Sequence, residues 1–362
     1  MAKKTALNSI HRKYGGKMVE FAGWELPVQY SSALKEHLAV REAAGVFDVS
    51  HMGQLEVQGP DALRFVQTVT CNDVGMLSDF QAQYSAILTP EGTIIDDIVV
   101  YRFNSEHFFI CVNAATREKD VSWIESRAFG NIQIRDVSDE YVQLAIQGPK
   151  AESILQKILQ TDLSAMKFYW FGTSDIGGTE AIVSRTGYTG EDGFEVYLHP
   201  DKAEYLWEEL FKAGEGEGLM PAGLAARNTL RLEMKFALYG SDITEDTTPL
   251  EAGLGWIVKF GTGFIGEDRL REIKSEGISR KLVGFEMVDA GIAREGYPVI
   301  SEGEKSGLVT SGGYSPSLNK SIGLAYVPID NAFPGNSLAI EIRGRRREAK
   351  IVQTPFYKKK KF

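Results

Sequence analysis

Two short segments of this chain repeat one another, and this repeat constrains the possible fold more than any other feature. The segment at 57–63 (VQGPDAL) returns at 146–152 (IQGPKAE), and each copy ends a strand-like run and opens a helix. The same order of helix, three strands and helix follows each copy. Strands are expected near 82–88, 94–102 and 107–112 and again near 166–176, 180–185 and 194–199, with closing helices over 115–128 and 201–213. Two such units predict an α+β fold of duplicated split βαβ-like halves, with a ligand between the halves.

The region from 280 to 356 has a different pattern. Short β-rich runs recur every eight to twelve residues or so and are separated by glycines and prolines, which is typical of a small β-barrel. We therefore expect a C-terminal barrel domain that begins after a boundary near 275–280. The length of 362 residues agrees with two or three domains.

Composition excludes several classes of function. A formal charge of -9 and a pI near 5.3 argue against a nucleic-acid partner, because no basic stripe is present to neutralise phosphates. No apolar run reaches about eighteen residues and no apolar stretch follows the first residues, so we expect neither export nor a membrane span. The two distant cysteines, Cys71 and Cys111, fit reduced thiols in a cytoplasmic protein. The five histidines show no metal-binding spacing, so no metal site is predicted.

A glycine-rich connection lies between two strand-like runs, at 181–183 and 196–198. Its sequence is RTGYTGEDGFE, over 185–195, and it is longer than a tight hairpin requires. Its glycines allow the backbone to approach a ligand, Tyr188 offers an aromatic face, and Glu195 places a carboxylate at the start of the return strand. These features suit a flat heterocycle with adjacent N–H donors. A mobile surface hairpin with solvated acids is the alternative.

The strand expected at 94–102 contains two adjacent acids, Asp96 and Asp97. Because side chains alternate along a strand, the two carboxylates must face opposite sides of the sheet. At least one of them then faces an apolar environment, where a carboxylate needs partners or a shifted pKa, and this makes the pair a functional candidate. Exposure of both acids at a sheet edge is the alternative.

Two further groups carry weaker signals. His51 follows the run FDVS and could act as a base near neutral pH, although a structural hydrogen-bonding role is the more common use of a lone histidine. A helix expected over 221–236, opened by Pro221, places Arg227 and Arg231 one turn apart on one face. Such a pair could receive a carboxylate, or could form salt bridges to acids such as Glu233 or Asp192.

Several motifs in order resemble the T-protein of the glycine cleavage system, a family of tetrahydrofolate-dependent aminomethyltransferases. The similarity runs nearly end to end. The motifs that carry it are GGKMVEFAGWELPVQY at 15–30, FDVSHMG at 47–53, IIDDIVVY at 94–101, VNAATREKD at 112–120, SRTGYTGEDGFE at 184–195, PAGLAARNTLRLE at 221–233 and TSGGYSPSLNKSIGLAYV at 310–327.

The resemblance implies a three-domain cloverleaf with tetrahydrofolate, as co-substrate, in a central cavity. The domains would be a folate-binding domain of residues 1–53 and 140–276, a second α+β domain of 54–139 and a C-terminal β-barrel of 277–362. The partner would be the lipoylated H-protein, with the P- and L-proteins in the same system. The catalytic residue would be Asp97, and the folate contacts would be Met52, Tyr84, Asp97, Asn113, Tyr188, Glu195, Arg227 and Trp256.

Two alternatives come from related proteins. A non-catalytic folate-binding protein of the same fold would carry a Lys-Gly-Cys motif, and neither cysteine of this chain lies in one. The folate domain of a dimethylglycine- or sarcosine-oxidising enzyme is normally fused to a flavin-binding domain, for which this chain has neither the length nor a G-x-G-x-x-G segment near a first strand.

Overall fold

The computed structural model describes residues 2–301 and 303–359, which form two compact units. Of these residues, the first unit contains 2–67, 73–85 and 98–228, and the second contains 68–72, 86–97, 229–301 and 303–359. The chain passes between the units several times, and one of these crossings lies within a strand, between Asp97 and Ile98.

The repeat expected from the sequence is present in the order of the elements. The first copy comprises β5 (Gly53–Gln58), α3 (Ala62–Val69), β6 (Gln81–Leu88), β7 (Ile94–Asn104), β8 (His107–Val112) and α4 (Arg117–Ser126). The second comprises β10 (Val142–Gln147), α5 (Ala151–Gln156), β11 (Phe171–Ile176), β12 (Thr179–Ser184), β13 (Gly193–Leu198) and α6 (Ala203–Ala213). The sheets share one strand order, β6-β7-β8-β5 and β11-β12-β13-β10, so the α+β class and the duplication are confirmed.

The glycines of the repeated segment have a common physical reason. Gly59 and Gly148 have φ of 127° and 134°, a region that favours glycine. A Cβ at either position would lie 2.4 Å from a backbone carbonyl oxygen, that of Asn131 or that of Ala43. The segment is therefore repeated because each sheet needs the same close turn after its strand.

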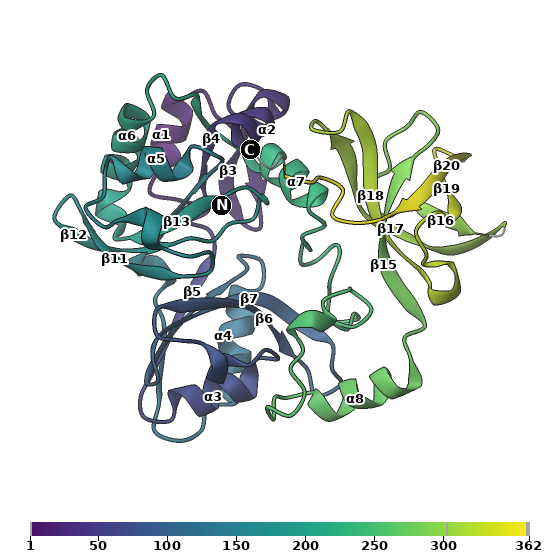
Figure 1. The fold of residues 1–362 in the computed structure, drawn as a ribbon, viewed down its shortest axis with the longest axis horizontal. Coiled ribbons are helices and arrows are strands. Elements are labelled where there is room, and N and C mark those ends of the chain that lie inside the picture. The colour runs from purple at the N-terminus through teal and green to yellow at the C-terminus, as the bar shows by residue number, and fades with distance from the viewer. Residues whose placement is uncertain (1, 302, 360–362) are drawn as a thin grey trace. The chain divides into compact units, whose positions relative to one another are not determined.

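The first unit also contains elements outside the repeat. Strands β4 (Ala44–Asp48) and β14 (Leu219–Pro221) extend the second sheet, and β9 (Gln133–Asp136) extends the first. A small sheet has the order β1-β3-β2, from Lys3–Lys4, Trp24–Gln29 and Lys17–Phe21. Helices α1 (Asn8–Lys13) and α2 (Ala33–Glu42) are also part of the first unit. Helices α5 and α6, which belong to the second copy of the repeat, pack against each other (Figure 1). Ser32 caps α2, because its Oγ accepts a hydrogen bond from the Lys35 amide.

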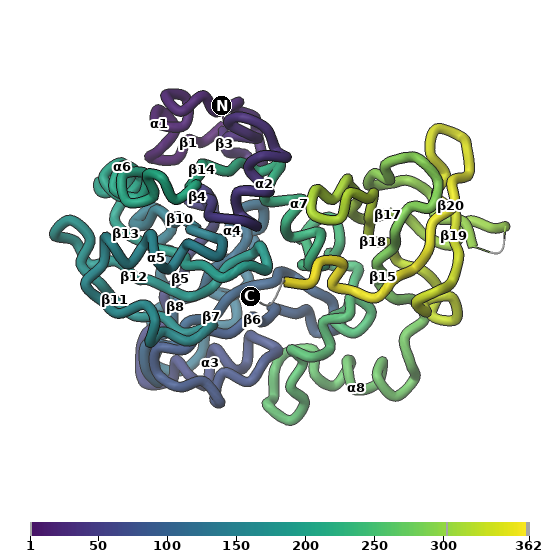
Figure 2. Tube along the Cα trace, turned by 45° about the horizontal axis from the view of Figure 1, so that its top comes forward, coloured from purple at the N-terminus to yellow at the C-terminus, as the bar shows by residue number. Residues whose placement is uncertain are grey.

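The second unit contains the strands of the barrel. They are β15 (Arg280–Met287), β16 (Pro298–Ser301), β17 (Glu304–Ser315), β18 (Lys320–Pro328), β19 (Ser337–Ile342) and β20 (Arg345–Val352). The barrel, whose backbone is drawn in Figure 2, closes in the order β15-β18-β17-β16-β19-β20. Its core includes Phe285, Val299 and Ile340. The predicted C-terminal barrel is therefore confirmed. Helix α8 (Glu267–Glu276) precedes it, and α7 (Leu224–Glu233) runs from the first unit into the second.

Short 3-10 turns connect these elements at Val74–Met76, Ser138–Glu140, Leu163–Ala165, Pro200–Lys202, Gly255–Ile257 and Ile329–Asn331 (η1 to η6). Over the described residues, every helix is too short or too polar to cross a bilayer.

Two expected boundaries are wrong. The helix expected over 221–236 begins only at Leu224, because Pro221 ends the short strand β14, which pairs with β4. The strand expected over 166–176 begins at Phe171. Before it, Tyr169 has a φ of 61°, which interrupts an extended chain.

Candidate functional site

The hairpin of β12 and β13 holds its long loop in a fixed position. Ser184 pairs with Glu195 across the hairpin, and Arg185–Asp192 forms the connection. Glu191 is buried and accepts a 3.0 Å hydrogen bond from Arg41, which also donates to the Thr189 carbonyl at 2.7 Å. The side chain of Arg185 binds both carboxylate oxygens of Asp192. The loop is therefore not the mobile hairpin with solvated acids that the sequence left as an alternative.

One glycine of this loop is required by close packing. A Cβ at Gly187 would lie 1.9 Å from Oε1 of Gln147, a buried side chain on β10. Gln147 accepts a hydrogen bond from Thr189 at 2.9 Å and donates to the Thr186 carbonyl at 3.0 Å. The two sides of the loop are thus tied to the same strand.

Glu195 is the carboxylate that this hairpin presents. Its Oε1 accepts a 2.9 Å hydrogen bond from Gln143 Nε2, and its Oε2 accepts a 2.5 Å hydrogen bond from Thr186 Oγ1. Burial raises the pKa of Glu195, while these two hydrogen bonds and the charge of Arg227 act in the opposite direction. Each carboxylate oxygen retains a lone pair beyond the bond described, so the group can still accept two N–H donors from a ligand.

Behind Glu195 lies a buried polar network that joins the two repeats. Gln143 accepts from Gln54 Nε2 at 3.1 Å and donates to the Tyr197 hydroxyl at 3.1 Å. The hydroxyls of Tyr197 and Tyr101 lie 2.9 Å apart. Burial raises the pKa of both tyrosines well above the usual value, so they remain neutral hydrogen-bonding groups. The network fixes the position of Glu195 from both halves of the duplication.

Arg227 and Tyr188 lie together beside this carboxylate. The guanidinium carbon of Arg227, on α7, lies 4.5 Å from the ring centroid of Tyr188. Its positive charge also acts on Glu195. The structure therefore brings three of the predicted site residues together, an aromatic face, a carboxylate and a cation. Met52 packs on the neighbouring aromatic cluster, which includes Tyr101 and Tyr197.

Tyr84 and Asn113 come from the sheet of the first repeat. Tyr84 lies on β6 on the same face as Ala82, which belongs to the same aromatic cluster. Asn113 follows β8, and its carbonyl accepts hydrogen bonds from the amide and hydroxyl of Thr116 just before α4. Both side chains are partly buried.

The remaining predicted residues belong to the second unit. Asp96 is fully buried and Asp97 is partly exposed, so the alternation expected along β7 is present. Trp256 lies in the turn η5 with 61% of its surface exposed. Arg231 is buried against Asp242 and Ser311, so it serves a structural ion pair, although with a different acid from those expected.

Four residues of the site were missed from the sequence. Gln143, Thr186, Tyr197 and Tyr101 all belong to the network around Glu195. One signal was present, since Gln143 interrupts the otherwise apolar run 142–146 of a fully buried strand. Tyr169 also lies near this carboxylate, because burial and then the charge of Glu195 raise its pKa to about 12.

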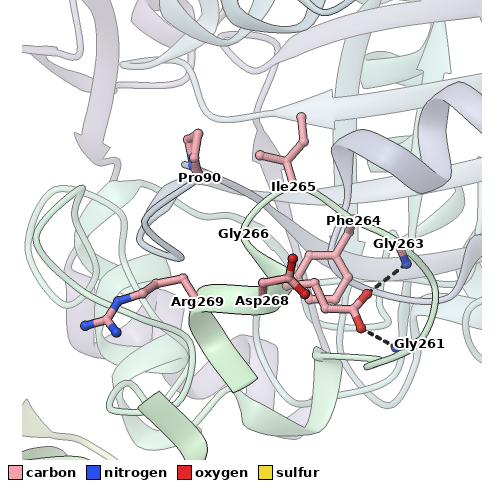
Figure 3. A pocket seen from close by; sticks show the side chains of 9 residues that line it. Pro90, Gly261, Gly263, Phe264, Ile265, Gly266, Asp268 and Arg269 are labelled. Carbon is pink, nitrogen blue, oxygen red and sulfur yellow. Dashed lines mark hydrogen bonds between the residues drawn. The ribbon is translucent and has the colours of Figure 1, made fainter. Parts of the chain in front are cut away.

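A separate hollow of about 580 Å³ lies in the second unit at the start of α8 (Figure 3). It is lined by Pro90 and by residues 261 and 263–269. Glu267 there accepts hydrogen bonds from the amides of Gly261 and Gly263 and from Arg271. The carboxylate thus closes the turn before its own helix, and the hollow contains none of the predicted site residues.

Two family descriptions match the chain, one for each part of this architecture. The GCVT N-terminal domain matches residues 7–262, and the glycine cleavage T-protein C-terminal barrel domain matches residues 280–358. The fold and the hairpin site therefore define a protein of the class that joins a GCVT domain to a T-protein barrel.

Individual relatives are similar in sequence to this chain over its full length. The aminomethyltransferase of a Geobacillus species is 49% identical and covers 100% of both chains, and that of Bacillus subtilis is 47% identical over 99% of this chain and 100% of its own. The crystal structure of the glycine cleavage system aminomethyltransferase T from Bartonella henselae is 34% identical, covers 100% of both chains and superposes with a TM-score of 0.94. The chain belongs to the glycine cleavage T-protein family of aminomethyltransferases.

Proposed function

We propose that this enzyme transfers the methylene of an aminomethyl group, carried on the lipoyl arm of an H-protein, to tetrahydrofolate. The aminomethyl thioether S–CH₂–NH₂ and the N5–H and N10–H of the folate give an N5–CH₂–N10 bridge, a free thiol and ammonia. Two new C–N bonds replace one C–S and one C–N bond, and no electrons are gained or lost. The reaction therefore needs positioning and proton transfer but no oxidant.

One observation in the first unit supports the folate part of this proposal. Glu195 is held by Gln143 and Thr186 beside the cation–π pair of Arg227 and Tyr188. A pterin presents adjacent N–H donors on its amino-pyrimidine edge, and a fixed carboxylate accepts such donors in pairs. The aromatic ring of Tyr188 suits the flat face of the same ligand. Met52, Tyr84, Asn113 and Trp256 are proposed as further folate contacts.

Asp97 is proposed as the catalytic residue. Its partly exposed carboxylate contrasts with the fully buried Asp96 beside it. Near the folate N5, an ionised carboxylate would take up a proton and stabilise positive charge that develops on the methylene as sulfur or nitrogen departs. Three further points stay predictions. They are the cytoplasmic location, the P- and L-proteins as members of the same system, and the division into three domains of residues 1–53 with 140–276, 54–139 and 277–362.

Ammonia release tests the reaction directly. The enzyme is mixed with tetrahydrofolate and an H-protein loaded with the aminomethyl group, and ammonia and 5,10-methylenetetrahydrofolate are measured together. We expect equimolar formation of both, and neither product when the H-protein is unloaded. Binding of tetrahydrofolate without turnover of the loaded H-protein would instead favour the non-catalytic folate-binding protein.

A further inference from the structure

His51 lies in a short connection whose backbone is fixed against β10. The connection joins β4 to β5. The Val49 amide donates to the Gln143 carbonyl at 2.9 Å, and the Gln143 amide donates to Ser50 Oγ at 3.1 Å. Because Gln143 also holds Glu195 through its side chain, the connection and the carboxylate share one support.

The imidazole of His51 is buried without a hydrogen bond at one nitrogen. The residue is 2% exposed, and within the described part of the chain its Nδ1 has no partner. Its ring approaches that of Phe21 edge-on, with ring centroids 5.9 Å apart. Burying a polar atom without a partner is unfavourable, so such a group in a folded protein needs an explanation.

A neighbouring histidine shows that the fold can satisfy an imidazole when its role is structural. His11 lies 2.7 Å from Asp48 through Nε2 and 2.8 Å from the Tyr30 hydroxyl through Nδ1. Asp48 uses its other oxygen for Ser50. The acid nearest to His51 in sequence is therefore already committed to other groups.

Residues of the candidate site also surround His51. The charge of Arg227 acts on His51 as it does on Glu195, and the same guanidinium lies over Tyr188. Met52, the next residue, packs on the aromatic cluster of Tyr101 and Tyr197. Burial, with the charge of Arg227, lowers the pKa of His51 to about 3, against the weaker opposite effect of Asp48. A neutral imidazole of this kind is a poor base at pH 7, but it can donate at one nitrogen and accept at the other.

We propose that His51 is a ligand-binding residue whose unpaired ring nitrogen forms a hydrogen bond to a polar N–H or C=O group of the folate co-substrate. This inference rests on the proposed function. It predicts opposite effects of His51 on stability and on binding. In the free protein the unpaired nitrogen is unfavourable, and only in the complex does it form a stabilising hydrogen bond.

Replacement of His51 by leucine distinguishes the effect on the free protein from the effect on the folate complex. For His51→Leu we expect a Tm without ligand that is equal to or higher than that of the wild type, because an unpaired buried polar atom is removed. The Kd for tetrahydrofolate, measured by anaerobic calorimetry, should rise at least about tenfold. His51→Gln, which keeps a donor and an acceptor, should recover part of this affinity.

His107→Leu is the matched control from the same unit. His107 lies 3.5 Å from Glu56, near Gln58, and stacks on Phe103 with ring centroids 4.5 Å apart. We expect its replacement to lower the Tm and to leave the Kd unchanged, which is the opposite combination.

A lower Tm or a failure to fold for His51→Leu, or an unchanged Kd with a retained Tm, would overturn the proposal, because either result assigns His51 a structural role. Wild-type protein that fails to bind tetrahydrofolate would instead overturn the proposed function itself, and this inference with it.

Discussion

Two adjacent acids on β7 should behave differently when each loses its charge. Asp97→Asn keeps the shape of the side chain but removes its basicity, so kcat should fall at least about a hundredfold, the low end of the effect of a general acid or base. Folate affinity should change much less, because Glu195 and Tyr188 are proposed to hold the pterin. Single-turnover kinetics with loaded H-protein measures the first effect and calorimetry the second.

Asp96→Asn is the control for this prediction. Its side chain is fully buried, so the substitution should act on stability and leave turnover within a few-fold in protein that is folded by circular dichroism. If folded Asp96→Asn loses turnover while Asp97→Asn retains activity, the catalytic residue is Asp96 and not Asp97.

Glu195 should contribute most of the pterin affinity. Glu195→Gln removes the negative charge while Gln143 and Thr186 remain in place, so folate binding should weaken by about 1.5 to 3 kcal/mol if the lost bonds are charge-assisted. Calorimetric titration with tetrahydrofolate checks this. Glu180→Gln, an exposed acid on the same hairpin, should bind as the wild type does. An unchanged affinity for Glu195→Gln would refute the pterin contact.

At the scale of one element, the hairpin loop depends on its contact with β10. Gly187→Ala would press a methyl group onto Gln147, and any shift of that side chain breaks its bonds to Thr186 and Thr189. We expect a loss of about 1 to 3 kcal/mol of unfolding free energy, measured by urea denaturation. Gly172→Ala on β11 is the control, since its nearest neighbour would lie 3.9 Å away.

A double substitution tests the cause of that loss. Removing the obstructing side chain, in Gly187→Ala with Gln147→Ala, should make the two effects strongly non-additive. Additive losses would mean that the close contact is not what requires glycine at this position.

At the scale of the whole molecule, two buried groups predict how stability depends on pH. The pKa of His51 is about 3 in the folded protein against an ordinary 6.5, so between these values the unfolded chain binds a proton that the folded chain does not. Stability should therefore fall as the pH drops from about 6.5 towards 3. Asp48, whose pKa is lowered to about 2 against burial by His11, Ser50 and Thr5, stabilises above its ordinary 3.8 and loses this contribution as the pH falls towards 2.

Urea unfolding at a series of pH values checks the histidine part of this dependence. Between about pH 4 and 6, His51→Leu should have a shallower slope than the wild type, by up to about one proton. An identical slope would show that His51 is protonated in the folded protein.

Features set by neighbours in the chain could be read from the sequence. The repeat with its glycines at 59 and 148, the hairpin and the barrel all follow from local backbone geometry and from alternation of apolar residues. The adjacent acids of β7 face opposite sides for the same reason, since two consecutive residues of a strand cannot share a face.

The tertiary structure alone decided which side chains support the candidate site. Tyr101 and Tyr197 are 96 residues apart and meet because the sheets of the two repeats pack against each other. Gln143 holds Glu195 through the pairing of β10 with β13. Among the described residues Nδ1 of His51 has no hydrogen-bond partner, and Asp48, the nearest acid in the sequence, is bound to His11 and Ser50. Contacts of this kind depend on strand register and on competition for one acceptor. Neither leaves a periodic pattern in the sequence, because both are settled only when distant segments are brought together.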